Sequence, residues 1–403
     1  MKSTKQFLVN NFILLSFGFC FSFFSSFGQT FVISLYVPYL QHDFNLSDSL
    51  FSSIYGVATL AGAFTINWLG RFIDKIRLTT FSIRVLIAYA FSLVLFSQAY
   101  YLPVLFLGIY GVRLFGQGLM IHISITSMAR FFNQNRGKAI SISALGHPFS
   151  EAFLPALVVA SLVYFGWRIS LVFSTVLILM MIPLTVYLLL KNRKFSQLKM
   201  YFPAIVTKEE VEQAKTSSLL KNKFFWMMAP MAIVSGATGT GYLFFQLKLG
   251  EIKGWSPTFI AAAFAAYAVA NALTGLLGGF LSDKFTGKKL FPFTLLPFAM
   301  GLIVLVLFNG WWVYVVFIAS IGFSNGFGSS VKNTAMAELF GTKMLGSVRS
   351  LFTTLTVFST ALGPLFFGIL LDARYSFELI SVMALILFVL ATINSLRILR
   401  VFR

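Results

Sequence analysis

Charged residues are scarce in this sequence. Asp, Glu, Lys and Arg make up 11% of its 403 residues, whereas soluble globular proteins average about a quarter. Hydrophobic residues make up 58%, and they gather in runs of about 20 residues, which are long enough to cross a bilayer as helices. This composition excludes an ordinary soluble protein and predicts a multi-pass, all-α membrane protein.

Cysteine and histidine are scarce as well. The single cysteine, Cys20, excludes an internal disulfide and a cysteine-based metal cluster. Three scattered histidines offer no convergent catalytic or metal-binding set, and no glycine-rich segment has the strand and lysine of a phosphate-binding loop. We therefore expect no cofactor, no metal site and no enzymatic activity. A membrane sensor would need an appended soluble domain, and the hydrophilic segments are too short for one.

The apolar runs predict twelve transmembrane helices, six in each half of the chain. We expect an N-terminal bundle over residues 1–190, a hydrophilic cytoplasmic linker over 191–222 and a C-terminal bundle over 223–403. The runs cover residues 12–38, 49–72, 78–98, 101–131, 137–163 and 168–190, then 223–247, 256–281, 288–308, 312–338, 347–371 and 377–399.

The net charge of +19 would suit nucleic-acid binding if the cations shared one soluble surface. Instead, most of the 31 Lys and Arg residues fall in alternate loops, on one side of the membrane if the N-terminus is cytoplasmic. The positive-inside rule explains this distribution. We expect a monomer with both termini in the cytoplasm, embedded in a lipid bilayer, with the bacterial plasma membrane as its location and no nucleic-acid partner.

The two halves of the chain repeat each other. A shift of 209 residues lays "GRFIDK" (70–75) on "GFLSDK" (279–284) and Pro155 on Pro364. Both halves begin on the same side of the membrane, which is the parallel repeat of a two-bundle transporter. The repeat therefore predicts two pseudo-symmetric six-helix bundles.

Three motifs resemble the major facilitator superfamily over essentially the whole chain. They are "GRFIDKIR" after the second run, "GFLSDKFTGKK" after the eighth, and "RLFGQG" (113–118) in the fourth. Within the superfamily, "RFFNQNRGKAIS" and "YFGWR" resemble the monocarboxylate and oxalate/formate porter branch. The resemblance implies a secondary transporter that works by alternating access, with its substrate site between the bundles.

Glu151 is the one acidic residue that we place near the middle of a predicted span. His147 lies four residues earlier on the same helical face, and Arg113 lies at a similar depth on the preceding, oppositely directed run. Glu151 either forms a buried ion pair with Arg113 or takes a proton while Arg113 meets an anionic substrate. His147 either passes that proton or hydrogen-bonds Glu151 or a carbonyl freed by Pro148.

The repeat also draws attention to Lys332. Arg113, Gln117 and Ser124 share one helical face, and a shift of 208 lays them on Ile321, Asn325 and Lys332. Two cations facing one cavity would favour an anionic substrate, whereas Lys332 could instead extend to the inner membrane interface. Gln29, Asn271 and Asn333 are further candidates for the cavity, and each has helix–helix hydrogen bonding as its alternative role.

The resemblance further implies a cytoplasmic gate. It places Asp74 beside the start of the eleventh helix, near Ser347, and Asp283 beside the fifth helix, near Gly137, where an anion meets a positive helix end. Local partners for these two carboxylates are expected among Lys75, Arg77, Arg130 and Lys284.

The function that we expect is transport of a small organic anion, a carboxylate, coupled to protons. Porters of the resembled branch carry a charged residue in the eighth helix, where this sequence offers Asn271. The alternative is efflux of amphipathic compounds, for which the 49 phenylalanines could form a binding wall.

Overall fold

A computed structural model describes residues 4–132, 135–190, 219–341 and 344–401. These residues fold almost entirely into helices, and no strand occurs among them. Ten helices of this described part are long and apolar enough to cross a membrane, and one of them, Arg136–Leu190, covers two of the predicted runs. The prediction of an all-α membrane protein is therefore confirmed.

The chain divides into two compact units. Unit 1 comprises Met1–Asn45 and Val57–Ala204, and unit 2 comprises Leu46–Gly56 and Ile205–Arg403. Helix α4 (Asp48–Leu69) therefore begins in unit 2 and continues into unit 1. Most of the predicted linker, 191–222, lies outside the described residues, which resume at residue 219.

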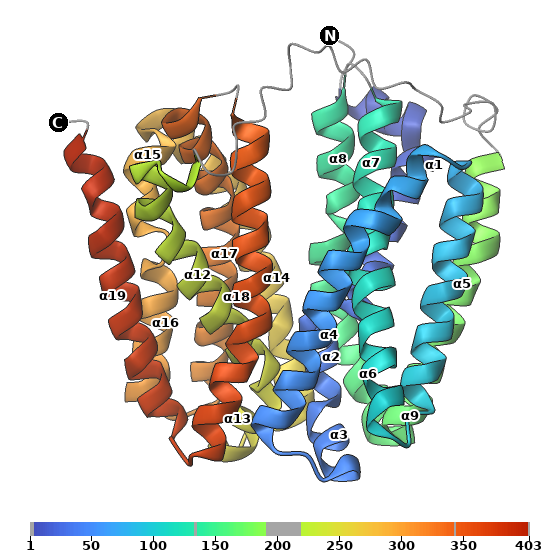
Figure 1. The fold of residues 1–403 in the computed structure, drawn as a ribbon, viewed down its shortest axis with the longest axis horizontal. Coiled ribbons are helices and arrows are strands. Elements are labelled where there is room, and N and C mark those ends of the chain that lie inside the picture. Colours follow the sequence, from blue (N-terminus) through green and yellow to red (C-terminus); the bar gives the residue numbers. More distant parts are fainter. Residues whose placement is uncertain (1–3, 133–134, 191–218, 342–343, 402–403) are drawn as a thin grey trace. The chain divides into compact units, whose positions relative to one another are not determined.

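Unit 1 is built around α1 (Thr4–Phe24), which packs against α7 (Ile121–Phe131), α8 (Arg136–Ala144) and α9 (Gly146–Leu190), as Figure 1 shows. Helix α5 (Leu78–Ser97) packs against α9 and α6 (Leu102–Gly111). The remaining elements are η1 (Ser25–Gly28), α2 (Thr30–Ile33), η2 (Ser34–Tyr36), α3 (Val37–Phe44), η3 (Gly70–Asp74) and the π-helical η4 (Val112–Met120).

Two predicted runs of unit 1 differ from the structure. The run 12–38 was expected as one helix, but it breaks where η1 ends and Gln29 takes an extended conformation, with φ −85° and ψ 155°. The run 137–163 is divided into α8 and α9 at Leu145, which keeps right-handed helical angles of φ −59° and ψ −21°, and Pro148 lies in the first turn of α9, where its missing N–H costs no helical bond. Gly166, with φ 76°, separates the two predicted runs that α9 covers.

Unit 2 centres on two helix pairs. Helix α14 (Pro257–Phe285) packs along α17 (Trp311–Phe340), and α12 (Lys223–Phe244) packs along α18 (Leu345–Asp372). Buried rings fill the space between helices, with Tyr242 5.0 Å from both Phe317 and Phe367. The other elements are α13 (Gln246–Lys253), α15 (Gly287–Leu290), η6 (Phe291–Phe293), α16 (Leu296–Leu307) and α19 (Phe377–Val401).

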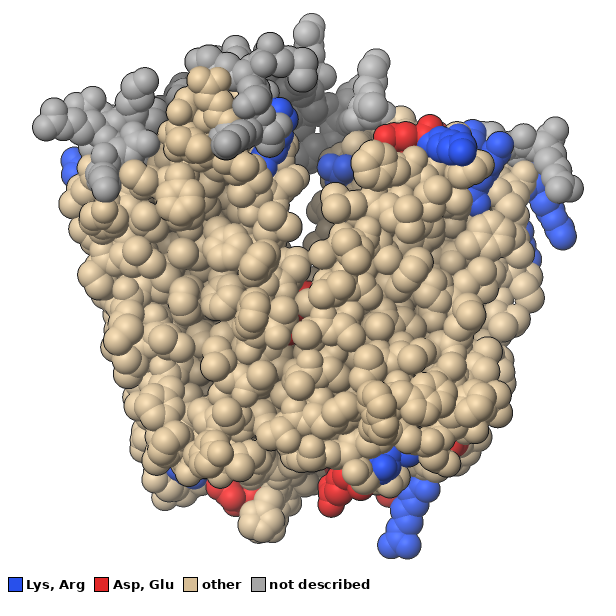
Figure 2. All heavy atoms as spheres, turned by 180° about the vertical axis from the view of Figure 1, so that it is seen from behind, with Lys and Arg blue, Asp and Glu red and all other residues tan. Residues whose placement is uncertain are grey.

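The surface matches the expected bilayer setting. In Figure 2 the charged side chains gather at the top and bottom of the view, and the face between them is almost free of charge. Large hydrophobic side chains are exposed in both units, including Phe64 and Phe153 in unit 1 and Phe280 and Phe366 in unit 2. An apolar surface of this extent requires hydrocarbon around it.

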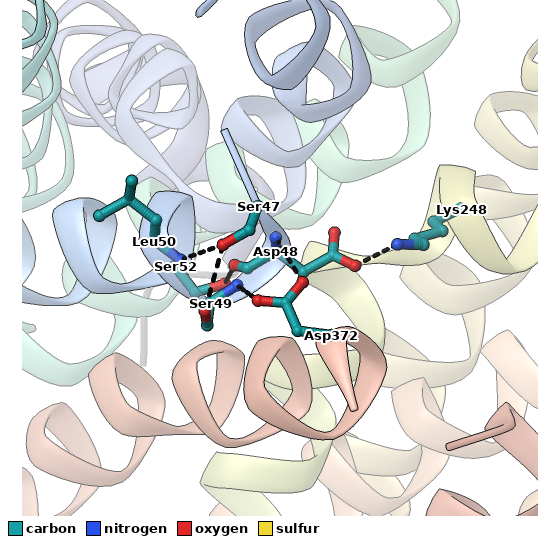
Figure 3. A network of polar contacts seen from close by, with 7 residues as sticks. All are labelled: Ser47, Asp48, Ser49, Leu50, Ser52, Lys248 and Asp372. Carbon is teal, nitrogen blue, oxygen red and sulfur yellow. Dashed lines mark hydrogen bonds and ion pairs between the residues drawn. The ribbon is translucent and has the colours of Figure 1, made fainter. Parts of the chain in front are cut away.

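A polar network fixes the start of α4 in unit 2 (Figure 3). The Asp372 carboxylate at the end of α18 accepts hydrogen bonds from the backbone N–H groups of Asp48 and Ser49, each at 3.0 Å. Lys248 of α13 forms an ion pair with the Asp48 side chain. A carboxylate at a helix N-terminus meets the positive end of the helix dipole. The network therefore joins α4 to both α18 and α13.

Candidate functional site

A break in one helix of unit 1 faces a widened turn in another. Helix η1 ends at Gly28, and a Cβ added there would lie 2.1 Å from the carbonyl oxygen of Val112 in η4. Only glycine allows two backbones to approach this closely. Because η1 does not continue as a regular helix, the Gly28 carbonyl is available to a side chain, and Arg113 uses it.

Arg113 joins three elements of unit 1. Its guanidinium donates from Nη1 to the Gly28 carbonyl at 3.0 Å and to Thr30 Oγ1 at 3.4 Å, and from Nε to Thr59 Oγ1 at 3.1 Å. The residue is 4% exposed. A buried guanidinium is tolerated when its donors are satisfied, and here they bind the broken first helix and α4.

Arg113 and Gln117 both lie in η4, the nine-residue π-helical segment. Short π-helical segments occur frequently at functional sites, because the wider turn redirects side chains. They also change the helical periodicity, so the shared face of Arg113, Gln117 and Ser124 stays a prediction. The Ser124 hydroxyl donates to the Gly18 carbonyl of α1 at 2.7 Å, and Arg113 likewise donates to a carbonyl of the first predicted run.

The fifth predicted span brings its ionisable pair to the same region of unit 1. His147 Nδ1 lies 3.3 Å from Glu151 Oε1, and Glu151 is 3% exposed. Between them, the Ser150 hydroxyl contacts that of Ser26 in η1. Gln29, which follows η1, is also buried. The break in the first helix therefore contacts both η4 and α9, while the ion pair between Arg113 and Glu151 stays a prediction.

Lys332 lines a cavity of unit 2. The cavity has a volume of about 290 Å³ and lies between α17 and α18. Lys332 is half-buried, and no carboxylate or hydrogen-bond acceptor contacts its ammonium among the described residues. The lining comprises Ser329, Lys332, Asn333, Met336, Arg349, Phe352, Thr353, Thr356 and Val357.

Arg349 is a lining residue that sequence reasoning missed. It lies at the border of the predicted run 347–371, whereas α18 begins earlier, at Leu345. Thr30 and Thr59, the hydroxyl partners of Arg113, were missed as well. A threonine inside an apolar run is too common for its sequence position to reveal such a contact.

The other predicted amides lie on the crossing of α14 with α17. Asn325 Nδ2 donates to the Tyr267 hydroxyl at 3.0 Å. A Cβ added at Gly326 would lie 2.0 Å from the carbonyl oxygen of Asn271, so the two helices touch at their backbones. Asn325 and Asn271 thus belong to a helix crossing, whereas Asn333 lines the cavity.

The predicted gate residues have different settings in the two units. In unit 1, Asp74 pairs with Arg130 of α7, and the Lys75 ammonium lies 5.6 Å from the Phe72 ring centre. In unit 2, Glu338, which is not one of the predicted gate residues, accepts hydrogen bonds from the backbone N–H groups of Gly287 and Lys288, at 3.0 and 2.9 Å, at the start of α15. Three further predicted gate residues are exposed side chains: Arg77, Asp283 and Lys284.

Comparison with known proteins decides the family. A family model described as Major Facilitator Superfamily matches residues 18–249 and 231–400. The chain belongs to this superfamily. It is therefore a multi-pass membrane transporter and not an enzyme. A comparison with curated protein sequences gave no match.

Solved structures of other superfamily members share this fold. A mutant of the nucleoside transporter NupG has a TM-score of 0.76 at 14% identity, covering 96% of this chain and 99% of that one. A bacterial homologue of the human lysosomal transporter Spinster, inward-facing and occupied, has a TM-score of 0.71 at 18% identity, covering 96% of both chains. A mutant peptide transporter POT bound to alafosfalin has a TM-score of 0.66 at 15% identity, covering 96% and 95%.

Identities of 14 to 18% show the fold and leave the substrate open. The resemblance to monocarboxylate and oxalate/formate porters therefore stays a prediction. The substrate has to be argued from the residues of this chain.

Proposed function

We propose that this secondary transporter carries a small organic anion and couples its movement to protons through Glu151. The observation that carries the proposal is the setting of Lys332, a half-buried cation that lines a cavity without a described carboxylate partner. A buried charge is costly unless it is paired. An anionic substrate would supply the missing charge.

Unit 1 supports the proton part of the proposal. Glu151 is buried and contacts His147, and both groups can bind protons, so the pair can hold a proton and release it. Arg113 enters the proposal as a positioning residue, because its described contacts hold the break of the first helix next to η4. Gln29 and Gln117 lie on these two elements and complete the proposed coupling region.

Topology and gating are part of the same proposal. We take both termini to be cytoplasmic in a bacterial plasma membrane, since this orientation puts most of the cations inside. Asp74, Lys75, Arg77, Arg130, Asp283 and Lys284 are then the proposed cytoplasmic gate. The ion pair of Asp74 with Arg130 supports a polar contact at that end of unit 1.

Uptake into proteoliposomes tests the proposal. The purified chain is reconstituted with an imposed pH gradient and offered small mono- and dicarboxylates alongside lipophilic cations. We expect saturable carboxylate uptake that rises with an inward proton gradient. Lys332→Gln should lower it by about 10-fold or more, the usual effect of removing a charged hydrogen-bond partner. Lys289→Gln, which removes an exposed cation of α15, is the matched control.

Glu151→Gln separates coupling from binding. The amide keeps the size of the side chain but cannot exchange a proton, so uptake should persist and lose its response to the gradient. Carboxylate uptake that ignores the gradient in the wild-type protein and is unchanged in Glu151→Gln would rule out coupling through this residue. Uptake of lipophilic cations in place of carboxylates would favour the efflux alternative.

A further inference from the structure

The α17–α18 cavity of unit 2 contains a second cation besides Lys332. Arg349 is the fifth residue of α18, has an exposed side chain and lines the same cavity, and its guanidinium contacts no carboxylate among the described residues. The described lining holds no Asp or Glu, so these two side chains give it two positive charges. One monovalent anion would leave one of them uncompensated.

The N-terminus of the helix that carries Arg349 adds to the positive potential of this cavity. The first turn of α18 contains no acidic residue, although acidic side chains are the ones that stabilise a helix N-terminus. Arg349 instead adds a cation where the helix dipole is already positive. Glu338 lies six residues beyond Lys332 on α17, but its carboxylate accepts from the backbone of α15.

The rest of the lining suits an anion with several oxygen atoms. The Asn333 amide can donate hydrogen bonds, and Met336, Phe352 and Val357 supply apolar walls. The Ser329, Thr353 and Thr356 hydroxyls donate to backbone carbonyls of their own helices at 2.8 to 2.9 Å, so they add polar surface to the lining. Guanidinium binds carboxylate and phosphate oxygens in pairs, whereas ammonium acts as a point charge. A volume of about 290 Å³ holds a compact organic molecule.

We infer that Lys332 and Arg349 together select a small organic dianion, one that carries either two carboxylates or one phosphate ester, over a monoanion of the same shape. The inference rests on the proposed anion transport and adds its specificity. Lys332 binds one negative charge, and Arg349 is the specificity-determining residue for the second.

Matched probes test this selection. Succinate and succinamate have nearly the same shape and differ by one charge, and ethyl phosphate carries its two charges on one group. Uptake of each at pH 7.5 gives a preference ratio of dianion to monoanion. In wild-type proteoliposomes we expect succinate or ethyl phosphate to be preferred over succinamate by about 10-fold or more, the effect of one charged hydrogen-bond partner. The dianion that is taken up faster shows whether the site prefers two carboxylates or one phosphate ester.

Substitutions test whether Arg349 binds the second negative charge of the substrate. Arg349→Gln should bring the preference ratio close to one, Arg349→Lys should keep most of the preference, and Lys332→Gln should lower uptake of every anion. Arg400→Gln, which removes an exposed cation of α19, should leave the ratio unchanged. The thermal unfolding midpoint in detergent shows whether each variant is folded, and added succinate should raise this midpoint more in the wild-type protein than in Arg349→Gln.

The outcomes separate the two proposals. If anions are carried with dependence on Lys332 but the preference ratio is near one, or is unchanged in folded Arg349→Gln, the selection by Arg349 is overturned and the anion transporter stands. If no anion is carried, or Lys332→Gln has no effect, the proposed function itself fails, and the dianion site fails with it.

Discussion

At two pairs of equivalent positions in the repeat, one unit has a cation and the other has an uncharged residue. In unit 1, Arg113 is buried and donates to the Gly28 carbonyl and to two threonines. The equivalent position in unit 2 is Ile321, which is also buried. In unit 2 the cation is Lys332, which lines a cavity, and its equivalent in unit 1 is Ser124, bonded to α1.

The helices that carry these positions also differ between the two units. The first helix of unit 1 breaks at Gln29 and its fourth contains a π-helical segment, whereas α12 and α17 continue as α-helices over 22 and 30 residues. Unit 1 uses its cation to hold irregular backbone in place. Unit 2 has regular backbone and leaves its cation facing a cavity. This difference supports the proposal that unit 1 provides positioning and proton coupling and that unit 2 provides the positive charge for the substrate.

Removing the buried cation of unit 1 should have the largest effect on the free energy of unfolding. Arg113→Met leaves the Gly28 carbonyl and the two threonine hydroxyls without their donor, and we expect a loss of about 2 to 4 kcal/mol in the free energy of unfolding. Ile321→Val at the equivalent position of unit 2 should cost about 0.5 to 1.5 kcal/mol. Unfolding in detergent measures both. Equal costs would contradict the structural role of Arg113.

The close backbone approach in unit 1 gives the second contrast. A methyl group at Gly28 would meet the backbone of Val112, so Gly28→Ala should cost about 1 to 3 kcal/mol and reduce transport. At Gly236, a glycine of α12 in unit 2, the nearest atom is the Ser359 hydroxyl, which can rotate away. Gly236→Ala should therefore be the milder substitution. A harmless Gly28→Ala would show that the two elements can separate without consequence.

The charged contacts near the proposed gate should have the smallest effect on stability. The Asp74 and Arg130 side chains are 55% and 30% exposed, so Asp74→Asn should change the free energy of unfolding by about 1 kcal/mol or less. Glu338→Gln, which weakens the cap of α15, should cost a similar amount. If Asp74 is a gate residue, its variant should nevertheless lose transport. Normal transport by Asp74→Asn would remove it from the gate.

The sequence predicted most of the fold, because long apolar runs and the positions of Lys and Arg report directly on helices that cross a bilayer. It also predicted the proximity of His147 and Glu151, since residues four apart share a helical face. Such predictions depend on local geometry that a regular helix guarantees.

What the sequence did not predict depends on departures from that geometry. The break at Gln29 and the π-helical segment around Arg113 stabilise each other across 85 residues of sequence, and neither has a local pattern that announces it. Arg349 was missed for a related reason. It lies at the border of a predicted run, and only the packing of α17 against α18 places it on the cavity beside Lys332.

Because helix α4 belongs to both units, the N-terminal half of the sequence does not contain all the residues that cover its own buried side chains. Phe51 and Tyr55, both fully buried, pack on Phe244 in unit 2, although they precede the linker by more than 130 residues. If the chain were cut within residues 191–222, these rings would remain on the N-terminal piece and would lose the helices that cover them. Co-produced halves should therefore be recovered together by a tag on either one, and the N-terminal half made alone should be degraded or aggregate.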